Sequence, residues 1–418
     1  MSKHVIAFNW IRLKLYILVD FVSFRQLPIL KRFESMENLS REELREFQFN
    51  TLNNTYEKLF GSRLDSWVEF FELPITYKSN LPSAPANPHK KIRTHETSGS
   101  TGEPRTIWVP KESWARKDAI FMRSWRRMGW TNQPILRLIS GEPKYEWYDW
   151  FRNVKPMNYK TLSNAHVDWV IKHRPFIIHG PGGAIRQLCE LIIERGQENI
   201  LGEVKIHWCS ESSQGHKSRL EKFVLEFHEQ YGLAELPTVG ATDGKGNLVL
   251  VEEQGIFEVV DENGSAVPEG HEGFIVVTDF NNYQTPILRY QCGDRGIIRA
   301  CYNSKGKERV VLERIIGRGV DYYFGPEVKR PIGWWVVAPI SHVAGTVISK
   351  WRCEIDIPNR AFRLYVKFRD SADFAPLEAY KEWINENLGL PVEVIEAKEE
   401  IFDIYWKNSL VKVLQNEN

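Results

Sequence analysis

Hydrophobic positions along the chain follow two different periods, and their alternation predicts a mixed α/β protein. Leu44, Phe47 and Leu52 recur at near-helical spacing behind Ser40, a residue type that caps helix N-termini, so residues 1–90 are expected to be largely helical. Strand-length apolar runs and helical patterns then alternate, with strands at 106–109, 134–139, 176–179 and 204–208 and helices at 111–128 and 184–195. Such alternation favours a sheet whose strands are joined by crossover helices.

The pattern changes beyond residue 247. Residues 247–298 are rich in β-type segments, which a hairpin-type turn at 261–264 divides. Farther on, a β-α-β unit is indicated by a strand, a helix and a strand at 361–368, 376–387 and 391–395. A chain of 418 residues is too long for one ordinary domain. We therefore expect an α/β fold with a large N-terminal domain of mixed sheets and helices, residues 1–317, and a small, mobile α+β C-terminal domain, residues 318–418.

Composition indicates which binding partners and which cellular compartment are expected. The formal net charge is +1, so no basic excess argues for nucleic acid as the main partner. The five cysteines include no C-x-x-C pair, which fits a reducing compartment better than a disulfide framework or a zinc site. We therefore expect a cytoplasmic protein.

The N-terminal segment 5–24 is fairly apolar, but Asn9, Arg12, Lys14 and Asp20 interrupt it. Crossing a bilayer takes about 20 uninterrupted apolar residues, so no transmembrane segment is expected. No signal-peptide cleavage site is evident either. The segment is predicted to be a buried or packing helix, with an interfacial helix that touches a membrane as the alternative.

A run of hydroxyl residues and glycines at 97–102 has the composition of a loop that wraps a phosphate chain. Backbone N–H groups and side-chain hydroxyls can converge on anionic oxygens there, and glycine permits a close approach. The run lacks the spacing and the lysine of a Walker P-loop. Its other interpretation is a flexible surface turn. The residues of this candidate phosphate loop are Thr97, Ser98, Gly99, Ser100, Thr101 and Gly102.

Three later motifs favour the phosphate-loop interpretation: Y-G-L-A-E at 231–235, R-Y-Q-C-G-D at 289–294 and G-R-G-V-D at 317–321. In order and spacing they resemble the signature motifs of the adenylate-forming (ANL) superfamily of acyl-CoA synthetases and related ligases. The chain is most similar to the branch of phenylacetate–CoA ligase and coenzyme F390 synthetase, which includes the CapK-type proteins of capsular polysaccharide biosynthesis. The resemblance runs from about residue 26 to the C-terminus.

This resemblance implies an adenylate-forming fold and an AMP-forming ligase. ATP and Mg²⁺ would activate a carboxylic acid as an acyl-adenylate, and the acyl group would pass to coenzyme A, a carrier-protein thiol or another acceptor such as a sugar. A role in surface polysaccharide biosynthesis follows from the CapK-type resemblance alone. The resemblance leaves a homodimer open.

The resemblance also assigns roles to residues of the large domain. The loop 97–102 would hold the β- and γ-phosphates, with Arg105 where the family usually has lysine. Tyr231, expected at the end of a helix over 223–231, would stack beside the adenine, and Gly232 would also belong to the nucleotide site. Glu235 would coordinate Mg²⁺.

Further binding residues follow from the same resemblance. Ser210 and Glu211 stand where the family has a Gly-Glu pair near the adenine. Asp294 would bind the ribose hydroxyls, since a carboxylate accepts two hydrogen bonds from a vicinal diol. Arg318 would contact ATP or the ribose at the hinge between the two domains.

Family members also carry a lysine near the C-terminus that stabilises the pentavalent phosphorus. Lys407 is the candidate, although no glycine precedes it, and Lys412 is the second choice. The turn at 180–183 would lie near the acyl site, where His179 is either a buried strand-end residue or part of the pocket lining. Residues 239–243 contain no cysteine or histidine, so the zinc site of some relatives is not expected.

Two other functions stay open. The chain could be an acyl-protein synthetase or an aryl-acid CoA ligase. It could also be a catalytically degenerate nucleotide-binding protein, because the C-terminal lysine motif departs from the family pattern.

Overall fold

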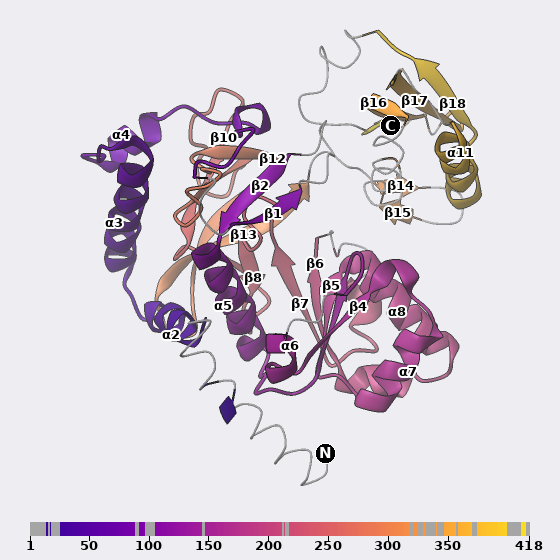
Figure 1. Ribbon diagram of the computed structural model, residues 1–418, viewed down its shortest axis with the longest axis horizontal. Coiled ribbons are helices and arrows are strands. Elements are labelled where there is room, and N and C mark those ends of the chain that lie inside the picture. The colour runs from indigo at the N-terminus through magenta and orange to yellow at the C-terminus, as the bar shows by residue number, and fades with distance from the viewer. Residues whose placement is uncertain are drawn as a thin grey trace.

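A computed structural model describes most of the chain, namely residues 14–15, 17, 26–87, 92–96, 105–143, 147–210, 213, 217–317, 322–324, 329–331, 340, 347–356, 358–369, 374–398 and 411–414. Its backbone forms a large mixed sheet with helices, a short separate hairpin and a small second sheet (Figure 1).

The N-terminal part is helical, as the sequence predicts, with α2 (Gln26–Met36), α3 (Arg41–Phe60), α4 (Trp67–Glu72) and the 3₁₀ turn η1 (Lys78–Asn80). Ser40 caps α3: its hydroxyl accepts from Glu43 N at 3.2 Å, and the Glu43 carboxylate accepts from Ser40 N at 2.7 Å. These hydrogen bonds hold the pKa of Glu43 below its usual value. The predicted N-cap is therefore confirmed as a reciprocal capping box.

Within the segment 5–24 the structure describes Lys14, Leu15 and Ile17, which are helical. Leu15 is 40% and Ile17 is 50% exposed, so the expectation of a buried helix is wrong at these two positions. No helix in the described part of the chain is long and apolar enough to cross a membrane.

The large sheet has 11 strands in the order β10-β11-β12-β13-β9-β8-β7-β6-β5-β3-β4. Its parallel half is formed by β3 (Ile135–Ile139), β4 (Val154–Asn158), β5 (Ile177–Pro181), β6 (Lys205–Cys209) and β7 (Glu226–Tyr231). The antiparallel half is formed by β8 (Gly240–Thr242), β9 (Leu248–Leu250), β10 (Gly255–Val260), β11 (Glu272–Asp279), β12 (Tyr290–Tyr302) and β13 (Glu308–Gly317). The predicted strands at 134–139, 176–179 and 204–208, the β-rich segment and its turn at 261–264 are confirmed.

Helices cover both faces of the parallel half (Figure 1). On one face α7 (Asn164–His173), α8 (Gly182–Glu194) and η3 (Glu198–Glu203) bury a core with the apolar side chains of β5 and β6. On the other face α5 (Lys111–Arg127) packs with α2 over Ile135 and Ile177. The helices predicted at 111–128 and 184–195 are thus confirmed. The remaining short elements of this region are α6 (Trp147–Phe151), η2 (Tyr159–Thr161) and α9 (Lys217–Leu220).

The predicted helix over 223–231 is wrong, because residues 226–231 form strand β7. Phe223, Phe227 and Tyr231 are spaced four residues apart, which imitates one face of a helix. Pairing with β6 on one side and β8 on the other overrides that local signal. Tyr231 therefore stands at the carboxyl end of a central strand.

A separate hairpin consists of β1 (Ile92–Glu96) and β2 (Thr106–Pro110), which pair antiparallel with Glu96 opposite Thr106. The strand predicted at 106–109 is confirmed as β2. A further short pair is β14 (Tyr322–Phe324) with β15 (Lys329–Pro331).

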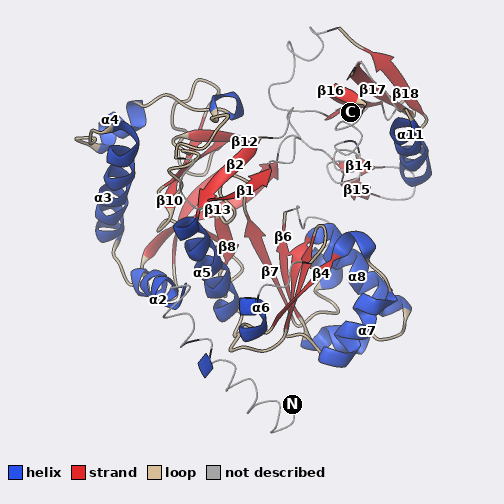
Figure 2. Cartoon of the chain, viewed as in Figure 1, coloured by secondary structure: helices blue, strands red, loops and turns tan. Residues whose placement is uncertain are grey.

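The small sheet has the order β18-β17-β16-β19 and lies beside α11 (Figure 2). Its elements are β16 (Ile348–Asp356), β17 (Ala361–Phe368), α11 (Ala375–Leu388), β18 (Val392–Glu396) and β19 (Val411–Leu414). Because β17 and β18 are parallel neighbours joined by α11, the predicted β-α-β unit is confirmed. Among the described residues, its buried core runs from Ile340 to Leu390, and Val392 and Val394 pack against it. The division of the chain at residues 317 and 318 stays a prediction.

Candidate active site

Two motifs that lie far apart in the sequence meet at the carboxyl end of β7. The Tyr231 hydroxyl donates to Asp294 Oδ2 of β12 at 2.6 Å. Burial raises the pKa of Tyr231 well above its ordinary value, and the neighbouring Asp294 charge adds to this. The phenol is therefore a neutral donor at physiological pH, and it fixes the position of a carboxylate that is 9% exposed.

A second hydrogen bond joins the same two motifs. The Tyr290 hydroxyl donates to Glu235 Oε1 at 2.7 Å, and Glu235 is 4% exposed. Glu235 sits in a tight turn in which Leu233 N donates to Leu236 O at 2.9 Å. A Cβ on Gly232 would overlap the carbonyl oxygen of Pro237, so only glycine allows the chain to turn here. Gly232 therefore positions Glu235.

Ser210 follows the last residue of β6 and has φ +69°. This is the left-handed region, which costs an L-residue about 1–2 kcal/mol and which glycine adopts freely. The chain thus keeps, with a serine, the backbone conformation that a glycine would favour at this position. Ser210 therefore has the backbone conformation expected of the glycine in the family's Gly-Glu pair. Glu211 itself lies outside the described residues.

Other predicted site residues cannot be placed in the same way. The loop residues 97–102, Arg318 and Lys407 lie outside the described residues, as Glu211 does. The hairpin brings both ends of the loop region together, because Glu96 and Thr106 are paired, and Arg105 directly precedes β2. Lys412 lies in β19, with its backbone opposite Glu354 of β16.

The sequence predictions missed a row of polar residues across the parallel half. Arg137 of β3, His179 of β5, His207 of β6 and His228 of β7 are successive register neighbours. Register neighbours in a parallel sheet point to the same face. His179 packs 5.4 Å from the Phe121 ring of α5, so this is the face that α5 covers. Only His179 stood out in the sequence, and the shared signal was a basic or imidazole residue inside successive apolar runs.

Hydrogen bonds fix the protonation of two of these histidines. Trp125 Nε1 donates to His207 Nδ1 at 3.2 Å, so this nitrogen is an acceptor. His179 Nδ1 lies 3.0 Å from the same atom and must donate to it. Burial lowers the pKa of His207 to about 3 and also lowers the pKa of His179, so both rings are neutral. His179 therefore keeps Nε2 as a hydrogen-bond acceptor.

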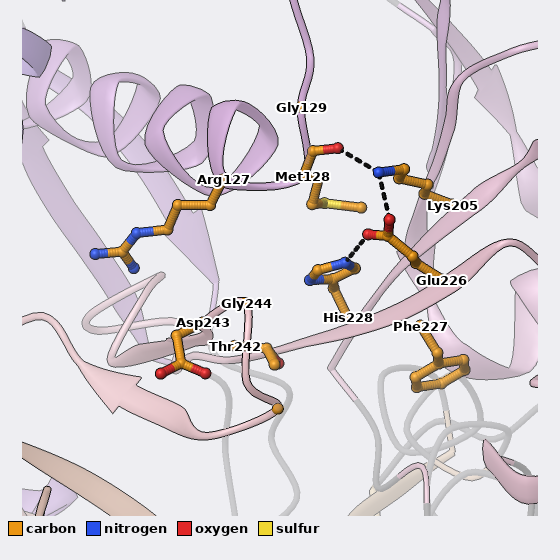
Figure 3. A pocket seen from close by; sticks show the side chains of 11 residues that line it. Arg127, Met128, Gly129, Lys205, Glu226, Phe227, His228, Thr242, Asp243 and Gly244 are labelled. Carbon is orange, nitrogen blue, oxygen red and sulfur yellow. Dashed lines mark hydrogen bonds and ion pairs between the residues drawn. The ribbon is translucent and has the colours of Figure 1, made fainter. Parts of the chain in front are cut away.

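A cavity of about 450 Å³ lies at the other edge of the sheet, at the amino ends of β6 and β7 (Figure 3). Lys205 Nζ donates to Glu226 Oε1 at 2.6 Å and to Met128 O at 2.7 Å, while His228 Nε2 donates to Glu226 Oε2 at 2.8 Å (Figure 3). These charges compensate one another. Because the cavity lies at the amino ends of these strands, it is separate from the motifs that meet at the carboxyl end of β7.

The described part of the chain contains no clustered metal site. No group of three or more His, Cys, Asp or Glu residues there is arranged to hold a metal ion. Glu235 is a different case: Oε1 accepts from Tyr290, and Oε2 has no hydrogen-bond partner among the described residues. One carboxylate of this kind fits Mg²⁺ that is bound mainly through substrate phosphates and water.

Comparison with known proteins supports the fold. No family model and no curated relative match the chain. A crystal structure of 2-hydroxyisobutyryl-CoA ligase with 2-HIB-AMP and CoA in the thioesterification state matches 94% of this chain and 90% of its own, with TM-score 0.58 and 18% identity. The same enzyme in the post-adenylation state with 2-HIB-AMP gives TM-score 0.56 at 18% identity over the same shares of the two chains. The protein therefore has the α/β fold of the adenylate-forming ligases, with a large sheet-and-helix region and a smaller C-terminal sheet.

Proposed function

We propose that the protein is an ATP-dependent, AMP-forming ligase that activates a carboxylic acid as an acyl-adenylate. The observation that carries this proposal is the pair of hydrogen bonds from Tyr231 to Asp294 and from Tyr290 to Glu235. These hydrogen bonds bring together the side chains that the family resemblance implies for binding adenine, ribose and metal. The fold is shared with a ligase that was crystallised with an acyl-AMP.

In the proposed first step an oxygen of the acid carboxylate attacks the α-phosphorus of ATP. The new P–O bond forms as the bond from the α-phosphorus to the pyrophosphate oxygen breaks, and pyrophosphate leaves. The loop 97–102 would hold the β- and γ-phosphates, and Lys407 would stabilise the charge that develops around phosphorus. Asp294, held by Tyr231, would accept the ribose hydroxyls, and Arg318 would bind at the hinge.

The adenine would lie beside Tyr231 and Gly232, with Ser210 and Glu211 at the end of β6 as its second boundary. Mg²⁺, when bound by Glu235 and the phosphates, would supply charge neutralisation. Because Tyr290 holds one oxygen of Glu235, the carboxylate is oriented before the nucleotide arrives.

In the proposed second step an acceptor attacks the acyl carbon and AMP leaves. A small domain of residues 318–418 would rotate against the large domain of residues 1–317 between the two steps. As the acceptor we propose the thiol of coenzyme A or of a carrier protein, which the CoA in the crystal structure of the neighbouring ligase supports. The CapK-type resemblance supports the phenylacetate–CoA ligase-like branch and a sugar acceptor in surface polysaccharide biosynthesis, in a cytoplasmic enzyme that could act as a homodimer.

The test is carboxylate-dependent exchange of labelled pyrophosphate into ATP, with the purified full chain and a panel of aryl, fatty, amino and hydroxy acids. We expect exchange with at least one class of acid. Lys407→Ala should slow it about 100-fold or more while ATP still binds, with Lys412→Ala as the matched variant. A protein that binds ATP but supports no exchange across the panel would instead be the catalytically degenerate nucleotide-binding protein, which the absent glycine before Lys407 favours. Thioester formation with coenzyme A or with a carrier protein separates a CoA ligase from an acyl-protein synthetase.

A further inference from the structure

Three basic side chains gather beside α5, near the sheet face that this helix covers. Lys117 Nζ of α5 lies 4.4 Å from the centre of the Trp114 ring and 6.0 Å from that of Phe121. The guanidinium carbon of Arg93, from β1, lies 4.9 Å from the same Trp114 ring. Arg137 stands on β3 beside His179. These three cations, together with His179, are called the basic cluster below.

The described residues supply no ion-pair partner for any of the three cations. Burial lowers the pKa of Lys117 to about 8. The charge of Asp118 opposes this shift, and the like charges of Arg137 and Arg93 add to it. Lys117 is still mostly cationic at neutral pH. Lys117 and Arg137 are half-buried, whereas Arg93 is exposed. Like charges at half-buried positions repel one another, and an anion bound between Lys117 and Arg137 would relieve the repulsion.

Two further polar atoms next to the cluster lack a partner. Trp114 Nε1 and the Nε2 of His95, whose ring lies 4.7 Å from the Trp114 ring, are buried and have no hydrogen-bond partner among the described residues. Most buried polar atoms in proteins are hydrogen-bonded. Together with the acceptor Nε2 of His179, these atoms place polar groups and aromatic rings next to the three cations.

The basic cluster lies where a substrate of the proposed reaction would lie. Arg137 and His179 each stand two residues before the end of their strand, and ligands of open α/β sheets bind at the carboxyl ends of parallel strands. Ser210 and Tyr231 follow or end the neighbouring strands β6 and β7 at the same edge.

We propose that the basic cluster selects an acid whose acyl part carries a second negative charge, with a dicarboxylic acid as the simplest member of this class. The inference rests on the proposed function. The reacting carboxylate would face the α-phosphorus, and the second carboxylate would pair with Lys117 and Arg137. The rings of Trp114 and Phe121 would contact the carbon chain between them, a surface suited to an organic acid rather than to the phosphates of ATP.

Pyrophosphate exchange with matched acids tests the proposal. Pentanedioate and pentanoate have the same carbon chain and differ in the second carboxylate, and longer and aryl pairs extend the series. We expect KM to be at least about tenfold lower for the dicarboxylate. Lys117→Met and Arg137→Gln should each raise the KM for the dicarboxylate about tenfold and leave the KM for ATP within about twofold. Lys111→Met, an exposed lysine at the start of the same helix, is the matched control.

Lys117→Arg and Arg137→Lys keep the charge and should restore most of the preference, which separates loss of charge from loss of folding. Equal KM values for both acids of every pair, unaffected by the variants, would overturn the inference and leave the ligase function standing. A rise in the KM for ATP instead would assign the cluster to the nucleotide phosphates and also overturn it. Absence of both exchange and ATP binding would overturn the proposed function, and the inference with it.

Discussion

Tyr231 and Asp294 are 63 residues apart in the sequence, yet one hydrogen bond of 2.6 Å joins them. Replacing Tyr231 with Phe keeps the ring and removes a donor from a carboxylate that is almost fully buried. We expect ATP binding to weaken about tenfold, because Asp294 loses a group that orients it, and the free energy of unfolding to fall by about 1–2 kcal/mol. Titration calorimetry and urea unfolding measure the two effects.

Tyr365→Phe is the control for this change, because Tyr365 lies on β17 of the small sheet. ATP binding should not respond to it. Unchanged ATP affinity in Tyr231→Phe would separate this pair of side chains from nucleotide binding.

Individual site residues were predictable where a motif names them and not where geometry alone unites them. The motifs at 231–235 and 289–294 predict that Tyr231, Glu235 and Asp294 act together, and two hydrogen bonds connect these segments. The basic cluster could not be predicted, since Lys117, Arg93 and Arg137 come from a helix and two strands whose approach no local pattern encodes. The roles of the predicted residues stay predictions.

Among the elements, Arg289, which directly precedes β12, connects β10 with the C-terminal end of α4. This residue is 5% exposed; its Nη2 pairs with Glu258 Oε1 at 2.9 Å, and its Nε donates to Glu258 Oε2 at 3.2 Å. Its Nη1 also donates to the carbonyl oxygens of Phe71 and Leu73. Arg289 therefore has a structural role, although it stands at the start of a motif assigned to nucleotide binding.

Arg289→Met should lower the free energy of unfolding by about 3–5 kcal/mol, because it leaves the Glu258 carboxylate buried without its partner. Adding Glu258→Gln should recover part of this loss. Arg295→Met is the matched control, since its partner Glu272 is exposed, and about 0–1 kcal/mol is expected. Urea unfolding of the four proteins checks the prediction, and equal losses in the two single arginine variants would contradict it.

Element types followed from the sequence wherever one period dominated. Apolar runs at 134–139 and 176–179 became β3 and β5, and the alternation at 361–368 became β17. The prediction for the segment 223–231 was wrong because its aromatic residues have helical spacing, whereas the segment pairs with the strands β6 and β8. Strand order and register depend on contacts between distant segments, so neither they nor the row from Arg137 to His228 could be read from one sequence.

At the scale of the whole molecule, buried ionisable groups make stability depend on pH. Burial raises the pKa of Asp279 to about 6 from the unfolded value of 3.8, so the folded state binds this proton more tightly. The stabilising contribution is complete below pH 3.8 and is lost as the pH rises through about 6. Burial has the opposite consequence for His207, whose pKa falls to about 3 and which therefore costs stability as the pH falls below 6.5.

Asp279→Asn keeps the acceptor oxygen for Asn281 N, which lies 2.8 Å from Asp279 Oδ1, and removes the charge. We expect this variant to be more stable than the wild type at pH 7.5 by about 2–3 kcal/mol, and the difference to disappear near pH 4. Urea unfolding across this range measures it. A variant that is less stable than the wild type at pH 7.5 would show that the charge of Asp279 stabilises the fold.

The pairing of Glu96 with Thr106 in the β1–β2 hairpin has a consequence for how this protein can change. The pairing holds the two ends of the intervening segment next to each other. The length of this segment can therefore change without changing the register of the large sheet. Doubling the length of a flexible connection costs only about 0.6 kcal/mol of closure entropy. Insertions and deletions at 97–105 should therefore be tolerated by the fold even where they abolish catalysis. The sequence of this segment can therefore vary, in natural relatives or in designed variants, while the rest of the fold stays the same.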